Sequence, residues 1–319
     1  MRLRPTGVDL LDGVALLDGV ALAIEAATGS AGALGIAAAH HQAGGGAAWR
    51  ARIALKCSAV LGIPSSQAIR LAAACELVHQ ASIVHDDVQD GSRVRRDRSS
   101  AMDRFGVPTA ICLGDHFLVA AFGVLAELPC CGPLVRLFAS RVSEAAAGQA
   151  EEFSQDLWQD MDLPRYRALA AAKAGAVLAL PVQGAMLLAG LPDTEAGLAG
   201  EAARALGVAY QASDDIEDLA GDLARGALNG VVVFGLRSQR PDERQALLQL
   251  LDRARRQGLP VPEAALQAQR LRRWVSPFAG WASSILAETA TGHGVGAVLA
   301  EAAASIAGRL DPALTTHAA

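Results

Sequence analysis

Apolar and polar positions recur with helical spacing over most of the chain, whereas the strict alternation typical of β-strands is nearly absent. Val231–Val233 is the one run of three β-branched residues. No stretch rich in Pro, Ser or charge divides the chain, so the pattern predicts a single all-α domain over residues 1–319. Helices are expected over residues 49–61, 66–90, 107–126, 133–159, 164–190, 195–220, 241–256, 261–274 and 278–308.

Composition narrows the class of protein. The chain has 319 residues, of which 52% are hydrophobic and 19% charged, so a large core is available and bulk disorder is excluded. The formal net charge of −5 argues against nucleic acid as the main partner, because binding phosphate backbones needs a basic face. Aromatic residues make up 4%, which is too few for base-stacking platforms.

Cysteine usage and hydropathy favour a cytoplasmic protein without a transmembrane segment. The five cysteines form no CxxC pair, which suggests a reducing compartment. Asp9 and Asp12 interrupt the region where a signal peptide would need an apolar run. The uncharged window 174–192 contains Pro181 and fits a buried core helix better than a membrane span.

Two aspartate-rich segments, Asp86–Asp90 and Asp214–Asp218, each carry the pattern DDxxD and follow apolar stretches of predicted helix. Residues i and i+4 share a helix face, so each segment presents two carboxylates on the same side. Such hard oxygen ligands suit Mg²⁺ bound together with substrate phosphates. The alternative is a pair of solvated helix ends, but carboxylates beside apolar surface are costly without cations.

Basic residues accompany these motifs. Arg93, Arg95, Arg96 and Arg98 follow the first motif, where they either neutralise it or bind phosphate in a bidentate way. His79 precedes Asp86 by seven residues and therefore lies on the same helix face. A structural histidine is the alternative, but this polar stripe favours a ligand-binding role.

These residues, in this order, resemble the trans-isoprenyl diphosphate synthases, or polyprenyl synthetases, of the isoprenoid synthase fold. The resemblance runs from about Gly45 to Gly235 and implies one large helical bundle around a central cavity. The matching elements are Glu76–Asp90, the pair Arg95-Arg96, Gly114-Asp115, Gly148-Gln149, Lys173 with Ala174 in place of threonine, and Tyr210–Asp218.

The resemblance assigns roles to individual residues. It implies an allylic diphosphate held by three Mg²⁺ ions, condensation with isopentenyl diphosphate, and a homodimer. The implied metal ligands are Asp86, Asp90 and Asp214, supported by Asp87, Asp215 and Asp218. The implied allylic-diphosphate residues are Arg95, Lys173 and Gln211, and those for isopentenyl diphosphate are Arg50, His79 and Arg96.

Two departures from the family pattern affect the isopentenyl diphosphate site. Ala47 occupies the position of the lysine in the family's Gly-Gly-Lys element. The loop after Asp218 is short, and Arg225 is its one basic residue where the family carries two lysines. Each lost charge-assisted phosphate contact costs about 1.5–3 kcal/mol, so weakened binding of the acceptor is expected.

The resemblance also addresses product length. The residue five before the first aspartate helps to floor the product tunnel in this family, and here it is Ala81, next to Ser82 and one turn after Val78. Small residues leave the tunnel open and predict products of C20 or longer. The alternative is that another helix fills this space.

Three functions remain open. The first is a chain-elongating prenyltransferase. The second is a class I terpene synthase, or a prenyltransferase with another acceptor, which would explain Ala47; the scarcity of aromatic residues argues against a cyclase. The third is a non-catalytic subunit of a heteromeric synthase, although both aspartate motifs are intact.

Overall fold

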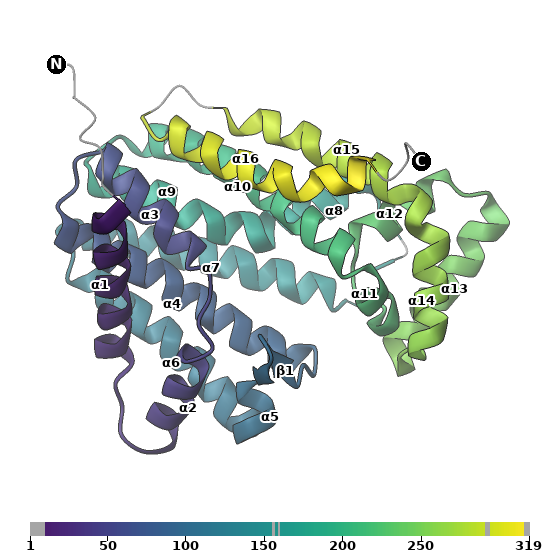
Figure 1. Ribbon diagram of the computed structural model, residues 1–319, viewed down its shortest axis with the longest axis horizontal. Coiled ribbons are helices and arrows are strands. Elements are labelled where there is room, and N and C mark those ends of the chain that lie inside the picture. Colours follow the sequence, from purple (N-terminus) through teal and green to yellow (C-terminus); the bar gives the residue numbers. More distant parts are fainter. Residues whose placement is uncertain (1–9, 155–156, 159, 291–293, 316–319) are drawn as a thin grey trace. The chain divides into compact units, whose positions relative to one another are not determined.

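The computed structural model describes residues 10–154, 157–158, 160–290 and 294–315, which are predominantly helical (Figure 1) and confirm the all-α prediction. The α-helices are α1 (Leu10–Thr28), α2 (Gly32–Gln42), α3 (Trp49–Val60), α4 (Ser65–Gln89), α5 (Ala101–Phe105), α6 (Val107–Ala126), α7 (Cys131–Glu152), α8 (Leu163–Ala170), α9 (Ala176–Leu188), α10 (Asp193–Glu217), α11 (Leu219–Arg225), α12 (Gly230–Ser238), α13 (Pro241–Gln257), α14 (Val261–Leu271), α15 (Val275–Leu286) and α16 (Gly296–Thr315). The shorter elements are strands β1 (Val94–Arg95) and β2 (Arg98–Ser99), the π-helical segment η1 (Ala171–Gly175), and the 3₁₀ turns η2 (Arg272–Trp274) and η3 (Ala287–Thr289).

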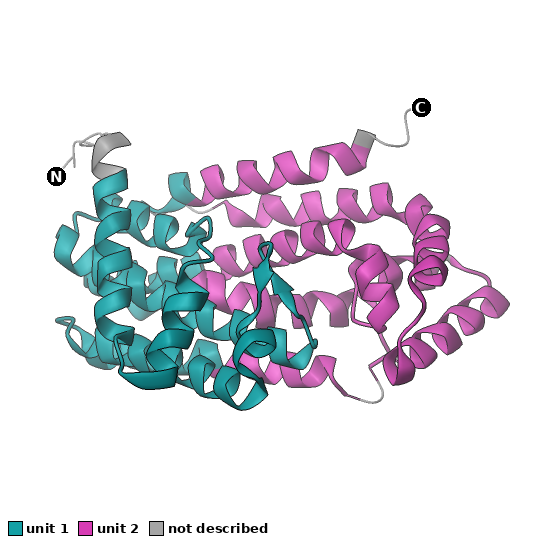
Figure 2. Ribbon diagram, turned by 60° about the horizontal axis from the view of Figure 1, so that its bottom comes forward, with its two compact units in different colours: residues 1–142, 180–200, 293–298 teal, residues 143–179, 201–292, 299–319 magenta. Residues whose placement is uncertain are grey.

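The chain divides into two compact units (Figure 2). Unit 1 comprises residues 1–142, 180–200 and 293–298, and unit 2 comprises residues 143–179, 201–292 and 299–319. Both units are therefore assembled from three separate stretches of sequence. A single domain over residues 1–319 stays a prediction, and the ends of that range lie outside the described residues.

Several predicted helices are shorter or broken in the structure. The stretch 164–190 contains the π-helical segment η1 between α8 and α9. The stretch 278–308 is two helices, because the backbone turns extended at Ala290; residues 291–293 lie outside the described part. The stretch 133–159 is helical only as far as Glu152, and residues 155, 156 and 159 are likewise not described.

Small residues bring the helices of unit 1 close together around α4. Ala81 and the alanines at 72–74 are fully buried on α4. Gly114 of α6 lies against His85, so closely that a Cβ at this glycine would be 2.2 Å from the His85 Nε2. The helix ends where Gly91 adopts a φ of +64°, which leaves the first aspartate motif at the end of α4.

Glycines also determine the packing of unit 2 around α10. A Cβ at Gly207 of α10 would lie 2.4 Å from the Cα of Gly175 in η1, so these two backbones are in direct contact. Gly230, the first residue of α12, fits in the same way against Tyr166 and Phe278. Close approach of α8, η1 and α12 to α10 fixes the surroundings of the second aspartate motif.

Two helical stretches of the described chain, Val107–Ala126 and Leu163–Leu188, are long and apolar enough to cross a membrane by length and composition. Their most apolar windows are 44% and 67% buried within the protein. The bent pair Leu219–Arg225 and Gly230–Arg237 would add a third if it formed one broken span.

Candidate functional site

The first aspartate motif occupies the last turn of α4 in unit 1, and its three aspartates differ in exposure. Asp86 is half-buried and Asp90 exposed, whereas Asp87 is 1% exposed. Arg95 donates two hydrogen bonds to the Asp87 Oδ1, at 3.0 Å from Nε and 2.6 Å from Nη2. Burial raises the pKa of Asp87, and the Arg95 guanidinium counteracts this rise. Asp87 therefore positions Arg95, while Asp86 and Asp90 present the i, i+4 pair of carboxylates.

The arginines after this motif are carried by a β-hairpin that the sequence pattern did not predict. Strands β1 and β2 are antiparallel, with Val94 opposite Ser99 and Arg95 opposite Arg98. The two turn residues, Arg96 and Asp97, have φ values of 52° and 59°. Positive φ is unusual for residues other than glycine and marks local strain, of the kind found near binding sites.

The hairpin brings Arg96 to the glycine-rich segment before α3. A Cβ at Gly46 would lie 2.6 Å from the Arg96 Nη1, so the guanidinium packs directly against the backbone of this glycine. Burial, and then the charges of Arg50 and Arg96, hold the pKa of His79 well below its usual value. His79 is therefore neutral near pH 7. Unit 1 thus brings together Arg50, His79 and Arg96, the residues predicted for isopentenyl diphosphate.

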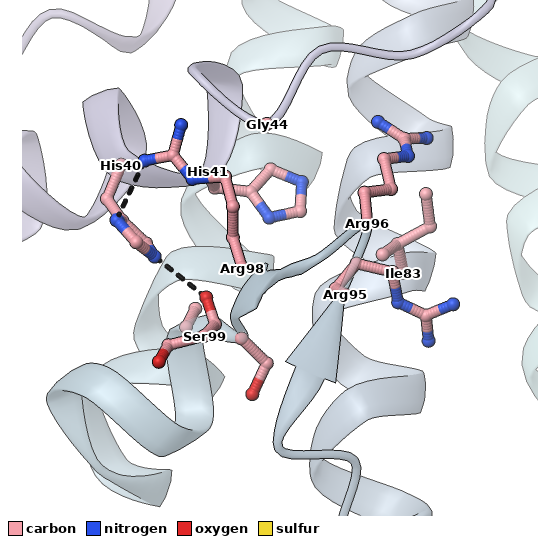
Figure 3. Close-up of a pocket in the computed structure, with 10 residues that line it drawn as sticks. His40, His41, Gly44, Ile83, Arg95, Arg96, Arg98 and Ser99 are labelled. Atoms are coloured by element: carbon pink, nitrogen blue, oxygen red, sulfur yellow. Dashed lines mark hydrogen bonds between the residues drawn. The ribbon is translucent and has the colours of Figure 1, made fainter.

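A pocket in unit 1 adjoins this group (Figure 3). Figure 3 shows two histidines and three arginines gathered around it, and none of the described lining residues is acidic. The lining residues are His40, His41, Gly44, Ile83, Arg95, Arg96, Arg98, Ser99, Ser100 and Ala101. Three arginines that line one pocket repel each other, and such a pocket is suited to an anion.

Sequence reasoning missed the two histidines of this pocket. A ring nitrogen of His40 lies 2.8 Å from the carbonyl oxygen of Ser99, which ties α2 to β2. Burial lowers the pKa of His41 to about 4, with further contributions from Arg96 and His40. The signal available in the sequence was the pair His40-His41 just before the glycine-rich segment.

The second aspartate motif ends α10 in unit 2, and its middle aspartate is enclosed by the fold. Asp215 is 2% exposed and accepts hydrogen bonds from the Tyr166 hydroxyl at 2.7 Å, the Gly230 N–H at 2.6 Å and the Gln211 Nε2 at 2.8 Å. Burial raises the pKa of Asp215 to about 7, and the nearby Asp222 adds to the rise. The metal role predicted for Asp215 is untested, and its carboxylate anchors α10 to α8 and α12.

Asn229 links the main chain at Asp215 to a second buried acid, Asp222. Its Nδ2 donates to the main-chain oxygen of Asp215 at 2.7 Å and to the Asp222 Oδ2 at 2.8 Å. Arg225 donates to the other oxygen of Asp222 at 2.7 Å. Burial raises the pKa of Asp222 to about 6, against the effect of Asn229 and Arg225. The one basic residue of the short loop is thus used within unit 2.

The remaining acids of this motif are more accessible. Asp214 is half-buried and accepts a 2.6 Å hydrogen bond from Arg309 of α16, and Asp218 is exposed. Sequence reasoning missed Arg309, since it lies 95 residues from Asp214 and outside any motif. Burial raises the pKa of Asp214, and Arg309 opposes that rise.

Lys173 lies in the π-helical segment η1, where it forms an ion pair with Glu152 of α7. A Cβ at Gly148 would come within 2.9 Å of the Ala172 Cβ, which explains the glycine in the Gly148-Gln149 element. π-Helical turns are rare and often occur at functional sites. Glu152 was not anticipated from the sequence.

The residues predicted to control product length all lie on α4. Val78 and Ala81 are buried, and Ser82 is half-buried with its hydroxyl donating to the His79 carbonyl at 2.8 Å. They belong to unit 1 together with the first motif. Lys173, Gln211 and the second motif belong to unit 2.

Among the described residues, no group of three or more His, Cys, Asp or Glu side chains is arranged to hold a metal ion by itself. The oxygen-only donors of Asp86 with Asp90, and of Asp214 with Asp218, nevertheless match the preference of a hard divalent cation. Such an ion would take its other ligands from water and phosphate.

Comparison with known proteins identifies the family. The model of the polyprenyl synthetase family matches residues 34–265, and the chain therefore belongs to this family. The chain is 28% identical over 181 residues to solanesyl diphosphate synthase 2 of Arabidopsis thaliana, covering 53% of this chain and 43% of that protein. It is 29% identical over 175 residues to octaprenyl diphosphate synthase of Haemophilus influenzae, covering 55% and 53%. The chain spans about half the length of the curated relatives it matches.

Solved structures support the same fold. A decaprenyl diphosphate synthase from Rhodobacter capsulatus matches 93% of this chain and 97% of its own, with a TM-score of 0.80 and 20% identity. A polyprenyl synthase from Caulobacter crescentus, complexed with calcium and isoprenyl diphosphate, matches 96% and 99%, with a TM-score of 0.77 and 22% identity. At this identity the likeness establishes the isoprenoid synthase fold.

Proposed function

We propose that the protein is a prenyltransferase that condenses isopentenyl diphosphate with an allylic diphosphate to give a longer trans-polyprenyl diphosphate. The observation that carries this proposal is the grouping of Arg50, His79 and Arg96 in the same unit as Asp86 and Asp90. Aspartate motifs alone would serve any reaction that ionises an allylic diphosphate. A second group of anion-binding side chains beside one of them supports an acceptor diphosphate as well.

Mg²⁺ fits the donor set, and we propose that Asp86, Asp90, Asp214 and Asp218 hold it. When bound, the metal supplies Lewis-acid stabilisation of the departing pyrophosphate. Three ions, as the family implies, would exceed what these carboxylates can coordinate alone, so diphosphate oxygens complete the coordination.

The protein's own side chains bind and orient the two diphosphates. Within unit 1 Arg95 is held by Asp87, and within unit 2 Lys173 is held by Glu152; the family resemblance assigns each of these cations to the allylic diphosphate. The allylic C–O bond breaks and its electron pair leaves with pyrophosphate. The double bond of isopentenyl diphosphate then attacks the allylic carbocation, and the departed pyrophosphate takes the released proton. Arg50 and Arg96 bind the acceptor diphosphate, with neutral His79 as a hydrogen-bonding partner.

The product is proposed to be C20 or longer. Ala81 is a small, fully buried residue of α4, four residues ahead of His85, and the family resemblance places this position beside the product tunnel. Relatives that match this chain carry the names octaprenyl diphosphate synthase, from Escherichia coli, and all-trans-nonaprenyl-diphosphate synthase, from Rhodobacter capsulatus. These names support a long product for this chain too.

A second candidate function is a class I terpene synthase or a prenyltransferase with a different acceptor. It is favoured by the loss of two acceptor cations, since Ala47 replaces the lysine and Arg225 is paired with Asp222. A non-catalytic subunit of a heteromeric synthase is the third. The family resemblance further supports a homodimer, and the five free cysteines support a reducing, cytoplasmic environment.

One series of incubations tests the proposal. Purified protein with Mg²⁺ receives dimethylallyl, geranyl, farnesyl or geranylgeranyl diphosphate, each with and without isopentenyl diphosphate, and the products are analysed by mass. Longer diphosphates that form only with isopentenyl diphosphate are expected. Hydrocarbons or alcohols forming without it would instead establish the second function, and no turnover of any substrate would favour the third.

A further inference from the structure

The guanidinium of Arg309, in the C-terminal helix α16, is held against the second aspartate motif. Its Nη2 donates to the Asp214 Oδ1 at 2.6 Å and to the Glu217 Oε1 at 3.0 Å. The same guanidinium lies over the ring of Tyr210, 4.9 Å from its centroid. All four residues belong to unit 2. Three neighbours on α10 thus fix a cation that comes from far along the chain.

Other cations near this motif already have acidic partners. Arg225 pairs with Asp222, and Lys173 pairs with Glu152. Asp214 and Glu217 lie in the last turn of α10 and Asp218 follows directly, so three carboxylates lie within five residues. Within the described part of the chain, Arg309 is the basic residue in contact with Asp214.

We propose that Arg309 is a diphosphate-binding residue of the second motif, held on Asp214 until a metal ion takes that carboxylate. This inference rests on the proposed function, because it assumes that Asp214 is a metal ligand. Arg309 of α16 then adds positive charge at the second motif, where Arg225 of α11 is paired with Asp222.

The guanidinium has donors left for a second partner. Only Nη2 of Arg309 donates a hydrogen bond to residues that the structure describes, so Nε and Nη1 remain for phosphate oxygens. Arginine matches phosphate geometry in a bidentate way. Its side chain is 30% exposed, and that of Asp214 33%, so solvent and ligands reach both. Stacking on Tyr210 keeps the guanidinium oriented while its partner changes.

The proposal predicts effects of opposite sign on two ligands. Arg309 competes with a metal ion for Asp214 when no diphosphate is present, so removing it strengthens binding of the bare metal. With diphosphate present, Arg309 contributes a charge-assisted contact, so removing it weakens binding. Replacing a purely structural arginine would not strengthen binding of the bare metal while weakening binding in the presence of diphosphate.

The test compares Arg309→Ala and Arg309→Lys with a matched control, Arg256→Ala. Arg256 is an exposed arginine of unit 2 paired with Asp252, so its replacement removes the same charge without removing a contact to the motif's aspartates that the structure describes. Binding of Mn²⁺ alone is measured by electron paramagnetic resonance, and binding of inorganic pyrophosphate at saturating Mg²⁺ by calorimetry. Circular dichroism and thermal unfolding verify that each variant is folded.

Arg309→Ala is expected to bind Mn²⁺ about two- to fivefold more tightly and Mg²⁺-pyrophosphate about 10- to 100-fold more weakly. Arg256→Ala should match the wild type in both. Weakening of both ligands, or no change in either, would overturn the proposal. If Arg309→Ala does not fold, Arg309→Lys decides: it keeps the charge without the planar fork, and unchanged pyrophosphate affinity would overturn the proposal.

These outcomes are separate from failure of the proposed function. A protein that does not condense isopentenyl diphosphate with an allylic diphosphate can still show tighter Mn²⁺ binding and weaker pyrophosphate binding in Arg309→Ala. In that case Arg309 retains its role. An elongating enzyme whose Arg309→Ala variant shows no shift would disprove only the role of Arg309.

Discussion

Two aspartates of one motif have different physical roles, as Asp215 and Asp218 illustrate. Asp215 is enclosed and accepts three hydrogen bonds from its own unit, whereas Asp218 is exposed at the end of α10. The end of the helix explains the difference, because Asp215 lies within α10, whereas Asp218 follows Glu217, the last residue of α10. The stability of the fold should therefore depend on Asp215, and ligand binding should depend on Asp218.

Asparagine substitutions separate these roles. Asp215→Asn replaces an acceptor by an amide donor that faces other donors, which is expected to lower the free energy of unfolding by about 1–3 kcal/mol. Asp218→Asn should leave that free energy within about 0.5 kcal/mol and reduce turnover roughly 10- to 100-fold. Chemical denaturation and a product assay measure the two quantities. The reverse pattern would contradict this assignment.

The pH dependence of stability follows from the raised pKa of Asp215. In the folded protein the pKa is about 7, above its ordinary 3.8, so the folded state keeps a proton that the unfolded chain loses first. The favourable contribution of the protonated Asp215 to the free energy of unfolding is complete below about pH 4. It declines as the pH rises to about 7. Urea unfolding at a series of pH values should show a flatter slope between pH 4 and 7 for Asp215→Asn. Equal slopes would refute the shift.

Product length depends on Ala81 if the tunnel passes this residue. Ala81→Phe is expected to shorten the longest diphosphate product, because the ring fills space beside a fully buried position of α4. Overpacking should also cost about 1–3 kcal/mol of stability. The control is Ala59→Phe at an exposed alanine of α3. An unchanged product distribution, measured by mass, would show that another element closes the tunnel.

At this scale the sequence predicts more of the first motif's surroundings than of the second's. Arg50 and Arg96 lie near His79, and the family resemblance had grouped these three residues. Arg309 carries no local signal, because its contact with Asp214 arises only when distant helices pack. The pattern DDxxD also does not predict the burial of Asp215, because it does not distinguish one aspartate from another.

Among the elements, long amphipathic helices were predictable and interruptions were not. α4 extends from Ser65 to Gln89, close to the expected 66–90. η1 interrupts the expected helix 164–190 at a segment of small residues, where no proline marks a break. The hairpin of β1 and β2 has Arg96-Asp97 in its turn instead of the Asn-Gly or Asp-Gly that signals such turns.

Glycine substitutions test how closely elements must approach. Gly207→Ala would place a methyl group 2.4 Å from the Cα of Gly175, and backbone cannot swing aside as a flexible side chain does. A loss of about 3 kcal/mol or more is expected. Gly123 of α6 has open space around it, and Gly123→Ala should stabilise by about 0.5–1 kcal/mol. Thermal unfolding of both variants gives the comparison; equal effects would be inconsistent with backbone contact at Gly207.

For the molecule as a whole, each unit carries one aspartate motif, so activity should require both. Asp86→Ala combined with Asp90→Ala is expected to abolish elongation while the protein stays folded, because the exposed or half-buried carboxylates make little contribution to stability. The same change at Asp214 and Asp218 should have the same effect. Activity that survives in a mixed assembly would identify this chain as its non-catalytic subunit.

The alternation of the two units along the chain has a consequence for the order in which the protein is made. A ribosome releases the chain from its N-terminus, and domains fold as their sequence emerges. Unit 1 includes residues 293–298, and unit 2 ends at residue 319. Unit 2 is not complete until α16 has been synthesised, so α10 must wait for the contact between Arg309 and Asp214. Nascent chains stalled before residue 293 should consequently engage chaperones and resist proteases poorly.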